Sequence, residues 1–234
     1  MKSSTEILNS IDGFLSAKWS RRQGIVVPTP SSIGLVNNEA VEIEGAVLYA
    51  DLAGSSKLTQ DYKDYFVAEI YKSFLFAAAE VIKNNNGEIT AFDGDRVMAV
   101  FVGDVKCSNA AKTALQIFGM VRKVNEHIAK AYPSTSYRIN YGVGLDCSKL
   151  FVVRTGVRGD NDLAWIGDAS NVAAKLSNLR GFPGRSFMTR RMFDRIADYS
   201  KYSIVNGNKE CMWSATSEMV LGHQVYQSTW YWDF

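Results

Sequence analysis

The segment Gly45-Ala-Val-Leu-Tyr-Ala-Asp51 decides the fold prediction, because an almost continuous apolar run ends there in a carboxylate. Such a run is typical of a strand whose two faces are both partly covered. Alternate side chains of a strand share a face, so Tyr49 and Asp51 are predicted to project together. The small-residue turn Ala53-Gly-Ser-Ser56 follows and leads into a helix, whose N-terminus favours phosphate.

A second segment, Phe92-Asp-Gly-Asp-Arg-Val-Met-Ala-Val-Phe101, places Asp95 in the turn of a predicted hairpin. If the strand ending at Asp51 lies beside this hairpin, two carboxylates meet. Like charges so placed repel unless a cation lies between them, which indicates a metal site. A metal-bound carboxylate pair suggests phosphoryl transfer on a nucleotide. The alternative is structural: Asp51 caps a helix and Asp95 serves the turn.

The surrounding periodicity predicts the remaining elements of the core. Apolar residues keep a helical rhythm from Val67 to Ile82, and Asn84-Asn-Asn-Gly87 supplies the stop. A second helix is predicted over 106–130. Strands are predicted at Tyr137–Leu145 and Leu150–Arg154, joined by a turn at Asp146-Cys-Ser-Lys149.

The predicted order is β-α-β-β-α-β, an α+β, ferredoxin-like arrangement with the helices on one face of the sheet. Further helices are predicted from Ala169 to about Leu179 and near 190–197. A C-terminal strand holds Val225 and Tyr226, and the aromatic residues around Trp230 are predicted to join the core or a dimer interface.

Residues 1–44 are predicted to be an extension and residues 45–234 a single domain. The extension contains a helix over 6–19 with an apolar stripe, whose members are Ile7, Leu8, Ile11, Phe14 and Leu15. This stripe packs either on the core or on a second chain. The segment Val26-Val-Pro28-Thr-Pro30-Ser-Ser is predicted to be an extended connector.

Composition excludes several functional classes. The net charge of +2 does not indicate a nucleic-acid partner, and basic groups such as Arg190/Arg191 are predicted to be solvated. Three widely spaced cysteines form neither a disulfide framework nor a thiolate metal site. No signal sequence or run of membrane-spanning length is present, so a soluble cytoplasmic protein without membrane contact is expected.

The stretch Gly167-Asp-Ala-Ser-Asn171-Val-Ala-Ala-Lys175 places an amide and a cation four residues apart, hence on one helix face. Such a pair suits a polyphosphate or a developing oxyanion. The alternative is that both side chains are simply solvent-exposed.

Together, Tyr-Ala-Asp51, Gly-Asp95 before Val-Met-Ala-Val-Phe101, and Gly167…Asn171-Val-Ala-Ala-Lys175 resemble the class III nucleotide cyclases over about residues 44–190. The resemblance implies a cyclase catalytic domain over 45–234 and two divalent cations, Mg²⁺ or Mn²⁺. It implies Asp51 and Asp95 as metal ligands, with the Leu52 carbonyl as an extra one.

The same resemblance implies that Asn171 orients the ribose and that Lys175 stabilises charge at the phosphate. It also implies a homodimer with composite sites, in which one chain supplies the aspartates and the other the Asn171 helix.

Two departures from that family concern the nucleotide base. Adenylate cyclases carry a purine-reading Lys where this chain has Ala91, and an Asp where it has Ala164. A purine would lack its polar partners, at a cost of roughly 1–3 kcal/mol for each unmet buried group.

A third departure concerns the phosphate. Lys175 stands where Arg is usual, so the charge is kept but the bidentate fork is lost.

A narrower resemblance accounts for these departures. Val-Val-Pro28, Val-Leu-Tyr-Ala-Asp51-Leu-Ala, Asp93–Asp104 and Phe151–Gly159 are similar to the pyrimidine (uridylate) cyclases of the bacterial Pycsar antiphage system. The resemblance implies conversion of UTP to cyclic UMP, a second messenger for a separate effector. Tyr49 narrows the predicted base pocket, and Arg96 offers donors to the carbonyl oxygens of uracil.

Three alternatives remain beside the uridylate cyclase. A cytidylate cyclase would make cyclic CMP at the same site. A non-catalytic cyclase-like domain would only bind a nucleotide, although the retained Asp51, Asp95 and Asn171 argue against it. A ferredoxin-like RNA-binding module is disfavoured, because the central strands lack an exposed aromatic pair with basic neighbours.

Overall fold

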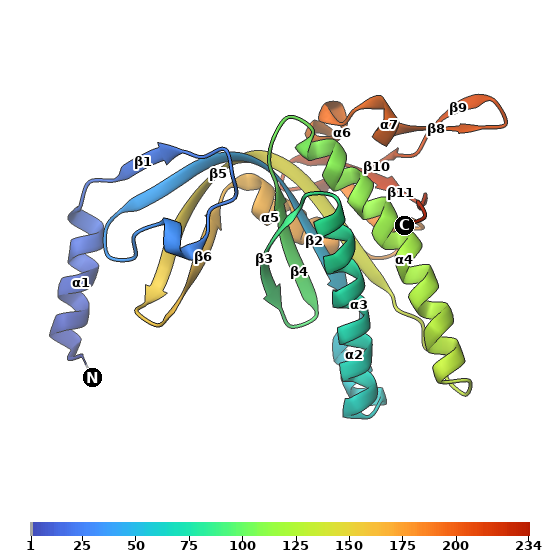
Figure 1. Cartoon of the computed structure of the whole chain (residues 1–234), viewed down its shortest axis with the longest axis horizontal. Helices are drawn as coiled ribbons and strands as arrows, with labels where there is room; N and C mark the ends of the chain where they lie inside the picture. The colour runs from blue at the N-terminus through green and yellow to red at the C-terminus, as the bar shows by residue number, and fades with distance from the viewer. Residues whose placement is uncertain (1) are drawn as a thin grey trace.

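Two long helices cover one face of a mixed sheet in the computed structural model, which describes residues 2–234 (Figure 1). The helices are α1 (Ser4–Ser16), α2 (Ser55–Asp61), α3 (Asp64–Asn84), α4 (Lys106–Ala131), α5 (Asp168–Ser177), α6 (Arg190–Arg195) and α7 (Asp198–Lys201), with a 3-10 turn at Pro30–Ser32. The main-sheet strands are β1 (Ser20–Gln23), β2 (Glu39–Leu52), β3 (Glu88–Asp93), β4 (Arg96–Phe101), β5 (Tyr141–Val157), β6 (Asp160–Ile166), β7 (Ser186–Thr189), β10 (Ser214–Val220) and β11 (His223–Ser228). A separate hairpin consists of β8 (Tyr202–Val205) and β9 (Asn208–Cys211).

The predicted ferredoxin-like core is confirmed in the order β2-α3-β3-β4-α4-β5. The sheet runs β10-β11-β7-β5-β2-β4-β3, with β1 added to β2 and β6 to β5. On α3 the predicted stripe is buried at Val67, Ile70 and Phe74 among others, and the helix stops where Asn86 adopts a left-handed φ of 60°. The apolar stripe and the Asn-Gly stop predicted for this helix are therefore both confirmed.

Strand β2 is longer than the predicted strand over 45–51. It begins at Glu39, and its first residues pair in parallel with β1. β2 thus crosses the predicted boundary between 1–44 and 45–234, and that division stays a prediction. The segment predicted as an extended connector is irregular and contains the 3-10 turn.

The predicted turn at Asp146–Lys149 is wrong, because β5 runs through it as one strand of 17 residues. Its ladder with β2 is unbroken from Val41↔Val152 to Leu52↔Tyr141. A polar Asp-Cys-Ser-Lys stretch can continue a central strand here because all four residues stay in register with β2 and the Asp146 side chain has buried partners of its own. The actual reversal follows β5 at Gly159 and leads into β6.

Helix α1 stands apart from the rest of the molecule (Figure 1). None of its residues is buried, so the Ile7 stripe does not pack on the core. The buried Asn38 amide donates to the carbonyls of Phe14 (2.8 Å) and Ala17 (2.9 Å), which fixes the end of the helix. Of the helices in residues 2–234, none combines the length and apolar character needed to span a membrane.

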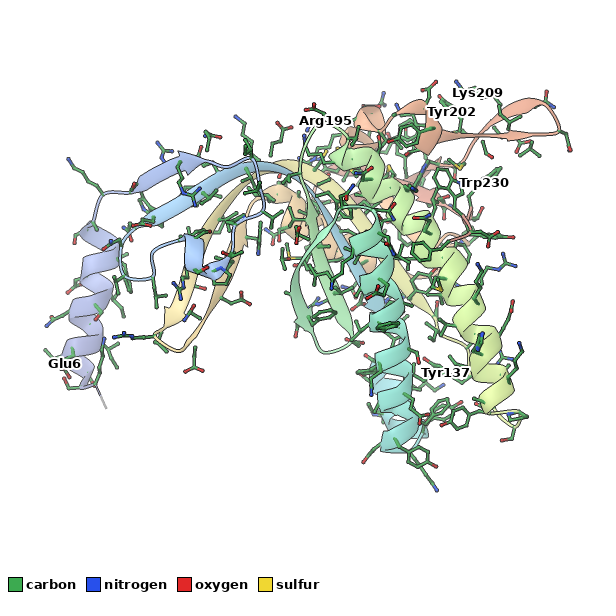
Figure 2. All side chains as sticks on the ribbon, in the orientation of Figure 1. Glu6, Tyr137, Arg195, Tyr202, Lys209 and Trp230 are labelled. Carbon is green, nitrogen blue, oxygen red and sulfur yellow. The ribbon has the colours of Figure 1, made fainter. Side chains whose placement is uncertain are left out.

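The aromatic C-terminus packs on the core beside α4 (Figure 2). Trp230 and Trp232 are partly buried against the main apolar cluster, and the Trp232 amide donates to the Leu115 carbonyl at 3.1 Å. These contacts within one chain agree with the core alternative for the aromatic cluster.

Gly119 on α4 allows this close approach, because a Cβ added there would lie 2.1 Å from the Trp232 carbonyl oxygen. We expect Gly119→Ala to lower the free energy of unfolding by about 1–3 kcal/mol, as overpacking does. The matched control is Gly13→Ala on α1, where a Cβ would meet nothing within 4 Å. Urea unfolding measures both variants, and equal midpoints would contradict the expectation.

Candidate functional site

The end of β2 and the β3–β4 turn form a pocket of about 430 Å³. Strand pairing sets Asp51 opposite Arg96 on β4, and the Leu52 amide donates to the Asp95 carbonyl at 3.3 Å. Asp51 and Asp95 therefore line one pocket, as the strand–hairpin pairing predicted, and Leu52 lines it with them. Its lining is completed by Gly54, Ser55, Ser56, Asp93, Gly94, Arg96, Asn178 and Arg180.

The carboxylates of Asp51 and Asp95 repel one another in this pocket. Burial, followed by the charge of Asp95, raises the pKa of Asp51, and nearby arginines offset only part of that rise. Residues 2–234 contain no cluster of three or more His, Cys, Asp and Glu side chains that could hold a metal. Two repelling carboxylates still fit Mg²⁺ or Mn²⁺, because Mg²⁺ commonly takes one or two carboxylates and completes its shell with water and substrate phosphates.

Arg96 lines this pocket, and its guanidinium lies over the ring of Tyr49. Tyr49 shares its strand face with Asp51, and the Arg96 guanidinium carbon lies 5.9 Å from the centre of the Tyr49 ring. Arg96 also forms a 2.5 Å ion pair with Asp93, so part of its donor capacity is used within the chain. Ala91 packs in the apolar cluster that includes Tyr49, whereas Ala164 lies on β6 opposite Val153 and outside that cluster.

Asn171 and Lys175 do not line the pocket of their own chain. Both are exposed on α5, which packs against β5 on the face opposite α3 and α4. Gly144 permits this packing, because a Cβ there would lie 2.1 Å from the Ala173 carbonyl oxygen. One chain therefore presents the aspartates in a pocket and the Asn171/Lys175 pair on an open surface.

Arg180 belongs to the pocket, and the sequence patterns did not single it out. Its guanidinium lies 3.1 Å from the Asp51 carboxylate. The two residues are 129 positions apart in the chain, so their pairing follows from the packing of α5 on β5. The one available signal was a basic residue just beyond a helix C-terminus, which is common in proteins.

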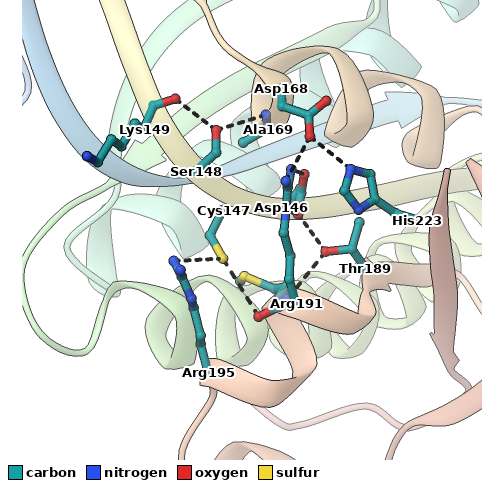
Figure 3. A network of polar contacts seen from close by, with 11 residues as sticks. Asp146, Cys147, Ser148, Lys149, Asp168, Ala169, Thr189, Arg191, Arg195 and His223 are labelled. Atoms are coloured by element: carbon teal, nitrogen blue, oxygen red, sulfur yellow. Dashed lines mark hydrogen bonds and ion pairs between the residues drawn. The ribbon is translucent and has the colours of Figure 1, made fainter. Parts of the chain in front are cut away.

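A second polar network fastens the start of α5 (Figure 3). The fully buried Asp146 accepts hydrogen bonds from Thr189 (2.5 Å) and from Arg191 Nε (2.9 Å). Arg191 also pairs with Asp168, the first residue of α5, at 2.7 Å, and His223 Nε2 lies 2.8 Å from the same carboxylate. The prediction that Arg191 is solvated is therefore wrong, since the residue bridges a buried charge to the helix that carries Asn171.

Known proteins are similar to this chain over almost its whole length. A uridylate cyclase of Burkholderia cepacia is 42% identical over 219 residues, which cover 93% of each chain. A uridylate cyclase of Xanthomonas perforans is 37% identical over 219 residues, covering 93% of this chain and 92% of its own. No family model matches the chain.

Solved structures share the fold. A bacterial light-regulated adenylyl cyclase superposes with a TM-score of 0.69 at 22% identity, covering 85% of this chain and 55% of that one. The guanylyl cyclase Cya2 gives a TM-score of 0.65 at 16% identity, covering 80% and 91%.

This architecture is that of the class III nucleotide cyclases, as the motifs around Asp51, Asp95 and Asn171 predicted. Within that class the chain belongs to the uridylate cyclase family, because it is 42% identical to a uridylate cyclase over 93% of both sequences.

Proposed function

We propose that this protein converts UTP to 3',5'-cyclic UMP and pyrophosphate, with two divalent cations bound at Asp51 and Asp95. The observation that carries the proposal is the pocket that unites both aspartates in a chain 42% identical to a uridylate cyclase. Asp51, Asp95 and the Leu52 carbonyl would hold the cations. Bound Mg²⁺ or Mn²⁺ supplies positive charge that eases deprotonation of the ribose 3′-hydroxyl and offsets charge on the phosphates.

The remaining chemistry depends on the residues of the chain. The 3′-oxygen bonds to the α-phosphorus, the bond from that phosphorus to the β-phosphate bridging oxygen breaks, and pyrophosphate leaves with the electron pair. The 3′-hydroxyl proton passes to solvent. Asn171 orients the ribose, and Lys175 stabilises the charge that develops at the phosphate.

We further propose that two chains build each site. Asn171 and Lys175 are exposed and absent from the pocket that holds Asp51 in the same chain. A homodimer that sets the α5 surface of one chain over the aspartate pocket of the other would complete two equivalent sites.

We propose that the base pocket favours a pyrimidine. Ala91 and Ala164 offer no polar partner to a purine, while Arg96 lines the aspartate pocket with its guanidinium over the Tyr49 ring. Arg96 carries donors that match the carbonyl oxygens of uracil. We propose that the resulting cyclic UMP acts as a second messenger in antiphage defence by activating a separate effector.

One assay tests the activity directly. The purified protein is incubated with Mg²⁺ or Mn²⁺ and each of the four ribonucleoside triphosphates, and the products are identified by mass. We expect cyclic UMP to dominate. Cyclic CMP as the main product would make the protein a cytidylate cyclase, and cyclic AMP would overturn the base-pocket argument. UTP binding without any product would favour a non-catalytic nucleotide-binding domain.

A further inference from the structure

Arg180 lies in the candidate active site, but the proposed conversion of UTP to cyclic UMP gives it no role. Its Nη2 donates to Asp51 Oδ2 at 3.1 Å, and the side chain is 33% exposed against 11% for Asp51. The guanidinium therefore reaches from the edge of the pocket to its most buried carboxylate.

Backbone carbonyl groups at the end of α5 hold the Arg180 side chain in place. Arg180 Nη1 donates to the carbonyl oxygens of Ser177 (2.6 Å) and Leu179 (2.9 Å), where α5 ends. The last carbonyls of a helix lack intrahelical partners and carry partial negative charge, so they orient a cation. Beneath them lies Gly142, the register partner of Asp51, where an added Cβ would come within 2.9 Å of Arg180 Nη1.

The two cations that line the pocket, Arg96 and Arg180, have different partners. Arg96 forms an ion pair with Asp93 at 2.5 Å. Arg180 is instead paired with Asp51, the carboxylate that the divalent cations require. When a cation takes over Asp51, the guanidinium loses its partner inside a pocket that also receives a triphosphate. A planar guanidinium binds phosphate oxygens in a bidentate manner.

We propose that Arg180 is a further substrate-binding residue of the chain that supplies the aspartates. Without metal and nucleotide, its guanidinium neutralises Asp51. With both bound, it turns to the oxygens of the terminal phosphates, which leave as pyrophosphate. The inference rests on the proposed function, since it assigns a residue to the phosphate end of the same site.

The variants Arg180→Gln and Arg180→Lys test this assignment, with Arg195→Gln as the matched control. Arg195 also pairs with a carboxylate, Glu44 at 2.8 Å, but both side chains are about half exposed and neither lines the pocket. Mn²⁺ binding to the nucleotide-free protein is measured by electron paramagnetic resonance. Pyrophosphate binding in the presence of Mn²⁺ is measured by calorimetry.

We expect Arg180→Gln to bind pyrophosphate about tenfold or more weakly, as loss of a charged hydrogen bond predicts. It should bind Mn²⁺ alone at least as tightly as the wild type, because the competing guanidinium is gone. The pyrophosphate affinity of Arg180→Lys should lie between those of the wild type and Arg180→Gln. Arg195→Gln should match the wild type in both measurements. A purely structural Arg180 would instead weaken Mn²⁺ binding and lower the melting temperature together.

Unchanged pyrophosphate affinity in Arg180→Gln would overturn the inference, as would that joint structural loss. Failure of the proposed function looks different. If the wild type makes no cyclic nucleotide but its pyrophosphate binding depends on Arg180, the cyclase proposal fails and this inference stands. If the wild type makes cyclic UMP and Arg180→Gln binds pyrophosphate normally, the cyclase proposal stands and the inference about Arg180 fails.

Discussion

Asp51→Asn and Asp95→Asn should each lower cyclase turnover by about a thousandfold or more while the protein stays folded. Each substitution removes a proposed metal ligand, and a loss of about 4 kcal/mol of transition-state stabilisation corresponds to a thousandfold in rate. Turnover is measured by cyclic UMP formation, and folding by circular dichroism. Near-normal activity in either variant would refute the two-metal assignment.

The stability of Asp51→Asn separates function from folding. Burial and Asp95 raise the pKa of Asp51, so the folded state favours its protonated form. Its stabilising contribution is therefore complete below the unfolded pKa and is lost as pH rises through the higher folded value. Asn does not ionise, so the variant should lack this pH dependence and be no less stable than the wild type at pH 7. A large drop in melting temperature at pH 7 would show that the lost activity reflects unfolding.

The same variant tests the composite site when it is mixed with Asn171→Ala. Each protein alone should be inactive. After random exchange of chains, half of the dimers combine the two variants, and each of these holds one intact site. About a quarter of wild-type activity should then return. A mixture that stays inactive although chain exchange is demonstrated would place Asp51 and Asn171 in the same chain's site.

Arg191→Ala should lower the free energy of unfolding by about 3–5 kcal/mol, because it leaves the carboxylate of Asp146 buried without its cation. Asp146 is fully buried, and its carboxylate accepts two hydrogen bonds from Arg191, one from Nε and one from Nη2 (Figure 3). Urea unfolding gives the value. Loss of Arg191 also removes one of the two side-chain partners of Asp168 at the start of α5, so we expect activity to fall even where the variant remains folded.

The neighbouring Arg190→Ala is the control for this prediction. Arg190 pairs with Asp194 at 3.6 Å, and both side chains are about 60% exposed. Exposed pairs contribute about 0–1 kcal/mol, so this variant should unfold almost as the wild type does. If the two variants lose equal stability, the buried network is not the cause.

Local patterns were enough to predict the core. The apolar run into Asp51, the helical stripe from Val67 to Ile82 and the Asn84–Gly87 stop each lie within one element, and all are found in the structure. The hairpin around Asp95 follows from a short turn between two apolar strands. Since β2 pairs with that hairpin, the meeting of Asp51 and Asp95 could be predicted too.

Local patterns did not predict where polar residues lie in the interior. Asp146-Cys-Ser-Lys149 has the composition of a turn, yet it continues β5 because Asp146 finds Thr189 and Arg191 more than forty residues later. A buried charge is tolerated only with such partners, and a local window of sequence does not contain them.

The amino-acid sequence alone therefore determined the strand and helix periods, the turn residues and the order of the two aspartates. Each of these features depends only on neighbours a few positions away. The Arg180–Asp51 pair, the Asp146 network and the separation of Asn171 from its own chain's pocket depend on how α5 packs against β5. Contacts between residues far apart in the chain exist only after the sheet has set its register, so they were found in the folded structure and not in the sequence.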